Sequence, residues 1–166
     1  MTIGTFNAGI GALICDEDSD TYLILKRSQD KDFAAGAWEC VTGRVDQGEG
    51  FEDALHREVH EELGIPVQPM FIIGTTHFYR GDARPDNELL GIVYCCTTPY
   101  PQGLRISHEH TEWRWVTPAE AFEVVGAGDS AEQWLKRVIE RAEIMRRHYP
   151  QALTTMHRLE GFELDS

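Results

Sequence analysis

Three glutamates, Glu58, Glu61 and Glu62, lie within five residues of one another. If this segment is helical, about 100° per residue places Glu62 inside an apolar stripe, between Phe51 and Leu55. Ionised carboxylates are costly to bury, and Glu58 and Glu62 stand four residues apart, where like charges repel each other. A bound divalent cation removes both objections. The pattern therefore predicts a cation site formed by these three side chains.

The alternative for the same glutamates is a solvated helix face covered with ion pairs. Arg57 is able to pair with Glu61 at i, i+4, in the less favourable orientation with the base before the acid. No Lys or Arg stands three or four residues from Glu58 or Glu62. The spacing therefore favours the cation site over the ion-paired face.

A helix from about residue 51 to 63 must position these carboxylates. Glu52 lies in its first turn, where acids suit the helix dipole, and Gly64 and Pro66 follow as stop signals. The apolar residues recur at helical spacing and form one face: Phe51, Ala54, Leu55, Val59 and Leu63.

The whole segment 43–65 carries a longer signature. It reads GRVDQGEGFEDALHREVHEELGI and matches G-x5-E-x7-R-E-U-x-E-E-x-G-U at every position, where U is aliphatic. This resembles the Nudix box, the mark of hydrolases that cut a nucleoside diphosphate linked to another group. The lead-in GAWECVTGRV and the closing stretch ISHEHTEWRWVTPAEA also resemble the family, so the resemblance covers most of residues 5–125. The VTG turn is similar to that of dihydroneopterin triphosphate pyrophosphohydrolases.

The element pattern predicts an α/β protein, and the resemblance implies a Nudix-type α/β/α sandwich with a mixed β-sheet. We expect one domain over residues 1–150 and a C-terminal tail over residues 151–166 with no assigned element. Apolar and β-branched runs predict strands at Thr5–Cys15, Thr21–Lys26, Ala37–Val41, Met70–Tyr79, Glu88–Thr97 and Glu112–Val116. Two further amphipathic segments predict helices at Pro118–Val125 and Ser130–His148.

The resemblance implies a metal-dependent pyrophosphohydrolase in which Glu58, Glu61 and Glu62 bind Mg²⁺ or Mn²⁺. Such a cation neutralises phosphate charge and activates a water for in-line attack on phosphorus. The general base is left open between Glu61, Glu62 and Glu109, with Glu88 a less favoured option.

Three further box residues are expected to support the glutamates. By resemblance, Arg57 orients them and Glu49 partners Arg57. Gly43 has two interpretations: a tight turn with positive φ, which we favour, or close approach of the backbone to phosphate.

Four residues outside the box are candidates for substrate contact. Arg27 ends a strand and either meets phosphate or is a solvated surface residue. Trp38 either stacks on a base or, as we favour, packs in the core. Tyr79 and Arg80 end a strand near where substrate is expected to lie. The substrate expectation is a nucleoside or pterin triphosphate; the alternatives are a nucleotide-binding or sensor domain without turnover and an RNA 5′-end pyrophosphohydrolase.

Composition limits the remaining classes. The 166 residues carry a formal net charge of −13, which argues against a nucleic-acid surface. The sequence has no apolar run long enough to predict a membrane span. The four cysteines lack the spacing of a zinc site and suit free thiols, so we expect a cytoplasmic protein. The resemblance also raises a homodimer, as in many relatives.

Overall fold

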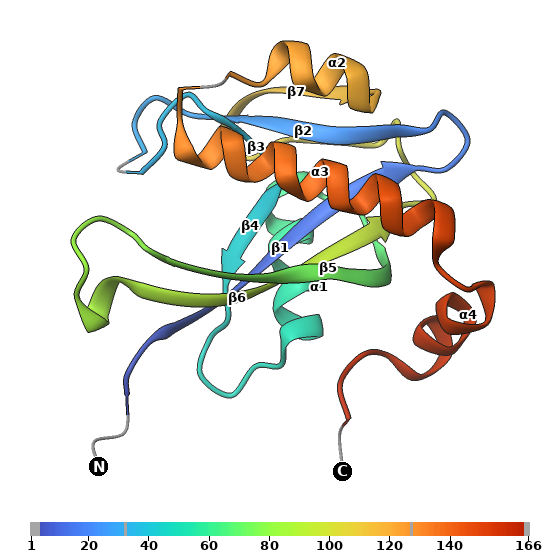
Figure 1. Cartoon of the computed structure of the whole chain (residues 1–166), viewed down its shortest axis with the longest axis horizontal. Helices are drawn as coiled ribbons and strands as arrows, with labels where there is room; N and C mark the ends of the chain where they lie inside the picture. The colour runs from blue at the N-terminus through green and yellow to red at the C-terminus, as the bar shows by residue number, and fades with distance from the viewer. Residues whose placement is uncertain (1–3, 32, 127, 165–166) are drawn as a thin grey trace.

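A mixed seven-stranded sheet forms the centre of the molecule (Figure 1). The computed structural model describes residues 4–31, 33–126 and 128–164. Its strands are β1 (Asn7–Asp16), β2 (Thr21–Arg27), β3 (Trp38–Glu39), β4 (Val41–Arg44), β5 (Gln68–Tyr79), β6 (Glu88–Thr97) and β7 (His110–Val116). The strand order is β3-β2-β1-β6-β5, with β4 paired to β1 and β7 paired to β2. Only β1 and β6 run parallel among these pairs, so the sheet is mixed as predicted.

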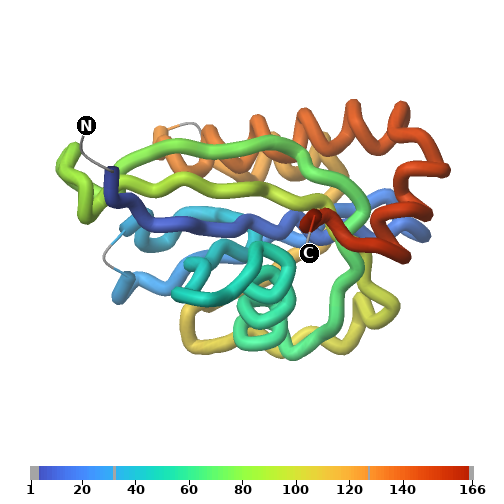
Figure 2. The backbone as a smooth tube through the Cα atoms, turned by 90° about the horizontal axis from the view of Figure 1, so that it is seen from below, coloured from blue at the N-terminus to red at the C-terminus, as the bar shows by residue number. Residues whose placement is uncertain are grey.

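Helices cover both faces of the sheet, which confirms the predicted sandwich. The helices are α1 (Phe51–Leu63), α2 (Pro118–Val124), α3 (Ser130–His148) and α4 (Gln151–Glu160). Figure 2 shows α3 along one face and α1 on the opposite face. One buried apolar cluster lies between the sheet and α2 and α3, and a second lies between the sheet and α1. No helix in the described ranges is long and apolar enough to cross a membrane.

Helix α1 forms as its pattern predicts. The residues of its apolar stripe are buried, apart from the half-buried Phe51 at its start. Gly64 ends the helix in the left-handed conformation with φ 67°, which a residue with a side chain adopts at a cost. The helix is therefore held by packing along one face, and that face also fixes the direction of its glutamates.

The predicted strand Ala37–Val41 is wrong in its extent. The structure has two short strands there, because the chain changes its pairing partner from β2 to β1 around Cys40. Strand β3 pairs with β2, whereas β4 pairs with β1 and continues to Arg44. This change of partner brings the start of the box beside β1.

The C-terminal segment contains helix α4, although the sequence pattern predicts no element after residue 150. Most of its apolar side chains stay exposed, so it shows little of the buried stripe by which helices are recognised. Beyond it, the ring of Phe162 stacks on His157 and meets Tyr94 edge-on. The segment therefore packs back on the body of the molecule.

The same segment caps the start of α1. The N-cap residue Gly50 makes no side-chain cap, and the Glu163 carboxylate accepts the backbone N–H of Phe51 instead. In return Glu52 accepts the backbone N–H groups of Phe162 and Glu163, at 2.7 and 3.2 Å. Two distant chain segments thus satisfy each other's free donors.

Replacing Glu163 by Ala is expected to lower the free energy of unfolding by about 0.5–2 kcal/mol, the usual effect of losing a helix cap. Thermal unfolding followed by circular dichroism measures it. Glu160→Ala is the control, because Glu160 is an exposed acid on α4. Equal melting temperatures for the two variants would contradict the capping role.

Candidate active site

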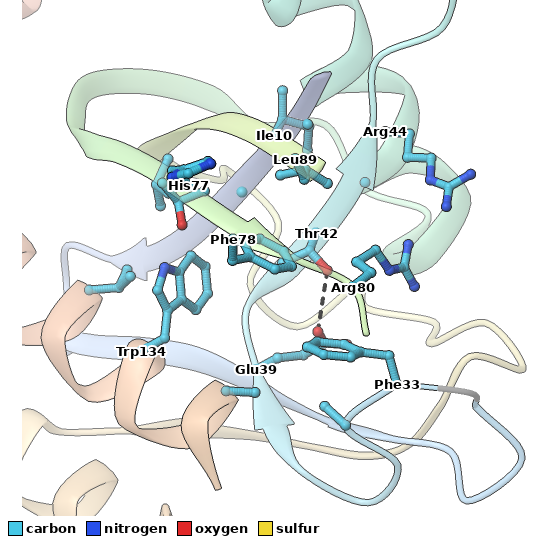
Figure 3. Close-up of a pocket in the computed structure, with 18 of the residues that line it drawn as sticks. Ile10, Phe33, Glu39, Thr42, Arg44, His77, Phe78, Arg80, Leu89 and Trp134 are labelled. Carbon is cyan, nitrogen blue, oxygen red and sulfur yellow. Dashed lines mark hydrogen bonds between the residues drawn. The ribbon is translucent and has the colours of Figure 1, made fainter. Parts of the chain in front are cut away.

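The glutamates Glu58, Glu61 and Glu62 of α1 differ in exposure, and only two of the three face a cavity. Their side chains are 6% exposed at Glu62, 15% at Glu58 and 59% at Glu61. A cavity of about 820 Å³ opens beside α1, between β1, β4, β5 and α3 (Figure 3). Glu58, Glu62 and Glu109 line it, whereas Glu61 does not. The box helix therefore presents a carboxylate pair, with Glu61 outside the cavity.

Glu62 is a buried acid without a hydrogen-bond partner. Its Oε2 atom has no partner in the described structure, and neither has Nδ1 of His110, which lies 3.8 Å away. Burial raises the pKa of Glu62 to about 9, with further contributions from Glu39, Glu58 and Glu109. Burial also raises the pKa of Glu58. Negative charge is therefore disfavoured here unless a cation is present.

Arg57 holds the carboxylates in place. Its guanidinium binds Glu49 through two N–H groups, at 2.8 and 2.9 Å, and donates to Glu58 at 2.8 Å. It also donates to the backbone oxygen of Arg44 at 2.8 Å, and its contact with Glu61 is longer, 3.4 Å. These hydrogen bonds from Arg57 lower the pKa of Glu49 to about 2. The geometry agrees with the supporting roles predicted for Arg57 and Glu49.

Replacing Arg57 by Lys is expected to lower both stability and turnover. A single ammonium group is unable to reproduce the planar fork that joins Glu49, Glu58 and the backbone. We expect a loss of about 1–3 kcal/mol in the free energy of unfolding and at least about tenfold in kcat. Arg84→Lys is the matched control, because Arg84 is exposed and its ion-pair contact with Asp82 is long, at 4.0 Å. Near-normal kcat and stability in Arg57→Lys would contradict the role.

The favoured interpretation of Gly43 is wrong. Gly43 lies within β4, opposite Ile10 of β1, and it is not among the positive-φ residues. A Cβ atom at Gly43 would lie 2.0 Å from Cδ of Glu58. The position needs glycine because the Glu58 carboxylate packs directly against its backbone.

Glu109, in the loop before β7, lines the same cavity and is paired with Lys31. Their charged atoms are 2.5 Å apart, and this contact lowers the pKa of Glu109. Glu109 is therefore ionised near neutral pH, in contrast to Glu62. Glu88, the less favoured option, binds His77 at 2.9 Å instead.

Sequence reasoning missed two buried residues behind the carboxylates. Glu39 of β3 accepts two contacts from one Arg27 nitrogen, at 2.8 and 2.9 Å, and lies 2.9 Å from Nε2 of His110. Thr42 donates to the same carboxylate at 3.2 Å, as Figure 3 shows. His110 directly follows Glu109, so it adjoined a residue already singled out. Glu39 alternates with core residues on a short strand and gave no distinguishing signal.

The four candidate substrate contacts occupy different places. Arg27 lines the cavity, but its guanidinium is engaged with Glu39, so it is neither a solvated residue nor free to clamp phosphate. Trp38 is 5% exposed in the core and does not line the cavity, as the favoured interpretation expects. Tyr79 and Arg80 both line the cavity, where Arg80 lies over the ring of Phe33 (Figure 3). Three of the four candidates, Arg27, Tyr79 and Arg80, therefore line the cavity, and Trp38 does not.

The end of the cavity that Glu58 and Glu62 line fits a divalent cation whose remaining ligands are not protein side chains. In the described part of the chain, no three His, Cys, Asp or Glu side chains converge on one point. Mg²⁺ is often held by one or two carboxylates together with waters and substrate phosphates. Glu58 and Glu62 supply such a pair, and the unpartnered Oε2 of Glu62 is an oxygen ligand without another role.

Comparisons with known proteins agree with this arrangement. The NUDIX domain model matches residues 5–141. The nucleoside triphosphatase NudI of Escherichia coli is 25% identical over 111 residues, 63% of this chain and 78% of its own length. The crystal structure of a MutT protein from Methanosarcina mazei superposes with a TM-score of 0.69 at 24% identity, covering 89% of this chain and 99% of that one. The E. coli dihydroneopterin triphosphate pyrophosphohydrolase superposes with a TM-score of 0.62 at 22% identity, covering 84% and 98%. With the family model spanning most of the chain and the box complete, the protein belongs to the Nudix hydrolase family.

Proposed function

We propose that this enzyme is a metal-dependent pyrophosphohydrolase that cleaves a diphosphate linkage in a nucleoside or pterin triphosphate. The observation that carries the proposal is the buried, unpartnered carboxylate of Glu62 on the wall of a large cavity, beside Glu58. A buried acid in this state costs stability, and a cation brought with an anionic substrate offsets that cost. The names of the NudI and dihydroneopterin triphosphate relatives point to the same substrate class.

The residues divide the chemistry between them. Glu58 and Glu62 would hold the cation, whereas Glu61 lies outside the cavity and is mostly exposed. The cation, when bound, neutralises phosphate charge and acidifies a water. Glu109 is the better placed proton acceptor, because the Lys31 contact lowers its pKa whereas burial raises that of Glu62. Arg57 and Glu49 keep the carboxylate of Glu58 in position.

Product release from a substrate panel tests the proposal. The panel contains nucleoside triphosphates, dihydroneopterin triphosphate, ADP-ribose, nucleotide sugars and diadenosine polyphosphates, each with Mg²⁺, Mn²⁺ or chelator. Metal-dependent release of pyrophosphate or phosphate from triphosphates supports the proposal. Binding of a nucleotide without turnover by folded, metal-loaded protein would replace it with the sensor function.

The cellular setting is part of the proposal. The four cysteines, Cys15, Cys40, Cys95 and Cys96, are buried and unpaired, which suits the reducing cytoplasm. The homodimer stays a prediction, and light scattering coupled to size-exclusion chromatography checks it.

A further inference from the structure

Glycines occupy several neighbouring positions of the sheet on the face that α3 covers. Gly11 of β1, Val93 of β6 and Gly74 of β5 form one row across three neighbouring strands. The next row is Gly9, Gly91 and Thr76. Four of these six positions therefore lack a side chain, and all six except Gly91 line the cavity, where they form its floor. Because neighbouring strands are about 4.8 Å apart, the row from Gly11 past Val93 to Gly74 spans about 10 Å, which is long enough for a flat two-ring heterocycle.

Helix α3 places an aromatic ring at one end of the first row and a guanidinium at the other. Cη2 of Trp134 lies 3.6 Å from the Cβ position of Gly11, and Nη1 of Arg141 lies 3.1 Å from that of Gly74. Arg137 stands one turn from Arg141, and it also lines the cavity. In Figure 3 the indole of Trp134 projects from α3 into the cavity, where the ring of Phe78 also lies.

Of the four arginines of α3, Arg137 and Arg141 have no acidic partner among the described residues, whereas Arg146 and Arg147 do. Most arginines of this acidic chain pair with a carboxylate. Within residues 4–31, 33–126 and 128–164, those with no carboxylate in ion-pair range are Arg44, Arg105, Arg137 and Arg141. Three of these four line the cavity, and Arg105 does not. Arg44 is next to Gly43, at the end of the cavity that Glu58 lines. Arg137 and Arg141 are therefore the two such arginines at the end near α3.

We propose that the glycine floor, Trp134, Arg137 and Arg141 form the subsite for the substrate's heterocycle. Trp134 stacks on the ring, and the guanidinium groups donate to a keto oxygen and the adjacent ring nitrogen. Guanine and hypoxanthine present this pair of acceptors, as does a pterin, whereas adenine presents an amino donor in place of the keto group. The preferred substrates are therefore triphosphates of 6-oxopurines or pterins, an assignment that rests on the proposed function.

Arginine is suited to this recognition. Its planar fork binds two adjacent acceptors at once, and it also stacks beside aromatic rings. With adenine in the site, a guanidinium N–H would face the amino group of the base, which is also a donor, and would stay unpaired. The preference for a keto base over adenine therefore has two sources: the hydrogen bond gained with the keto oxygen and the unpaired donor left with the amino group. A bidentate contact of this kind is worth about 5- to 150-fold in discrimination.

Turnover of GTP, ITP, dihydroneopterin triphosphate, ATP and CTP tests the subsite. In the wild type we expect kcat/KM for GTP and ITP to exceed that for ATP at least about tenfold. Arg137→Met and Arg141→Met are expected to lower the GTP value while leaving ATP within about threefold, so that the ratio approaches one. Arg105→Met removes an equally unpaired arginine outside the cavity and is expected to keep the wild-type ratio. Comparison of GTP with dihydroneopterin triphosphate tells which of the two ring systems the hollow prefers.

Two results would overturn the subsite. The first is equal use of GTP and ATP by the wild type. The second is an equal fall for both nucleotides in the arginine variants, which would assign these residues to phosphate instead. Titration calorimetry with GMP and AMP, without metal, gives a readout that does not depend on hydrolysis. A GMP preference that Arg141→Met abolishes supports the subsite even if no triphosphate is cleaved, in which case only the proposed function fails.

Discussion

Replacing Glu62 by Gln is expected to abolish metal-dependent turnover and, at the same time, to stabilise the metal-free protein at neutral and alkaline pH. The first effect follows from the loss of a cation ligand. The second follows from the pKa of Glu62, which is about 9 in the folded protein and near the ordinary value of about 4.3 when unfolded. Gln has a similar shape and carries no charge, so it avoids the desolvation that the ionised carboxylate suffers.

The sign of the pH dependence is fixed by these two values. Between pH 4.3 and 9 the folded wild type binds more protons than the unfolded chain, so its free energy of unfolding falls as the pH rises. The penalty is absent below the unfolded pKa and complete above the folded one. The stability gain of Glu62→Gln is therefore expected to grow through this window, by up to about 1.4 kcal/mol per pH unit.

Melting temperatures at pH 5, 7 and 9 in chelator measure the gain directly. Glu140→Gln is the control, since Glu140 is an exposed acid of α3 and is expected to show no such trend. Added Mg²⁺ should raise the melting temperature of the wild type and leave Glu62→Gln nearly unchanged. A pH-independent difference between wild type and Glu62→Gln, or normal turnover in the variant, would contradict the role of Glu62.

The parts of this fold that follow from local rules could be predicted from the sequence. Helix α1 shows a 3.6-residue apolar period and a glycine stop, and helix α3 begins and ends at the predicted residues. Helix α2 begins at the predicted Pro118, directly after Thr117, which exchanges the two bonds of a capping box with Glu120. Each of these signals lies within a few residues of the element that it specifies.

The features that escaped prediction depend on contacts between distant segments. Glu39 and His110 stand 71 positions apart and meet only because β2 pairs with both β3 and β7. The cap that Glu163 provides to α1 spans 112 positions. Periodicity describes one element at a time, so it indicates which face of a helix or strand is buried. It does not identify the polar group of another element that contacts this face.

The burial of Glu62 shows how far one element can inform about function. The wheel of α1 places this acid inside the apolar stripe, and the structure confirms that it is buried. The wheel places Glu58 between Ala54 and Phe51 and Glu61 at the edge of the stripe, and in the structure Glu58 lines the cavity whereas Glu61 is exposed. The exact place of the Glu58 carboxylate also depends on contacts that the wheel does not give, since Arg57 donates both to Glu58 and to the backbone oxygen of Arg44 in β4.

Replacing Gly43 by Ala is expected to remove activity while leaving the protein folded. The new Cβ would lie 2.0 Å from Cδ and 2.4 Å from Oε1 of Glu58, so the carboxylate must leave its present position. These atoms belong to the end of a flexible side chain, and Gly43 itself has no left-handed backbone that alanine would strain. The structural adjustment is therefore cheap, but it displaces a cation ligand by more than an ångström, and such a displacement lowers kcat/KM by about 100-fold or more.

Gly128→Ala is the matched control for this substitution, because a Cβ atom at Gly128 would meet nothing within 4 Å. Both variants are expected to melt close to the wild type, and only Gly43→Ala should lose turnover and weaken Mn²⁺ binding measured by electron paramagnetic resonance. The metal measurement separates the two explanations of this glycine. Loss of turnover with unchanged Mn²⁺ affinity would mean that the backbone of Gly43 meets phosphate instead. Weakened Mn²⁺ binding means that glycine is required there because β4 and the carboxylate of Glu58 must touch for the cation site to form.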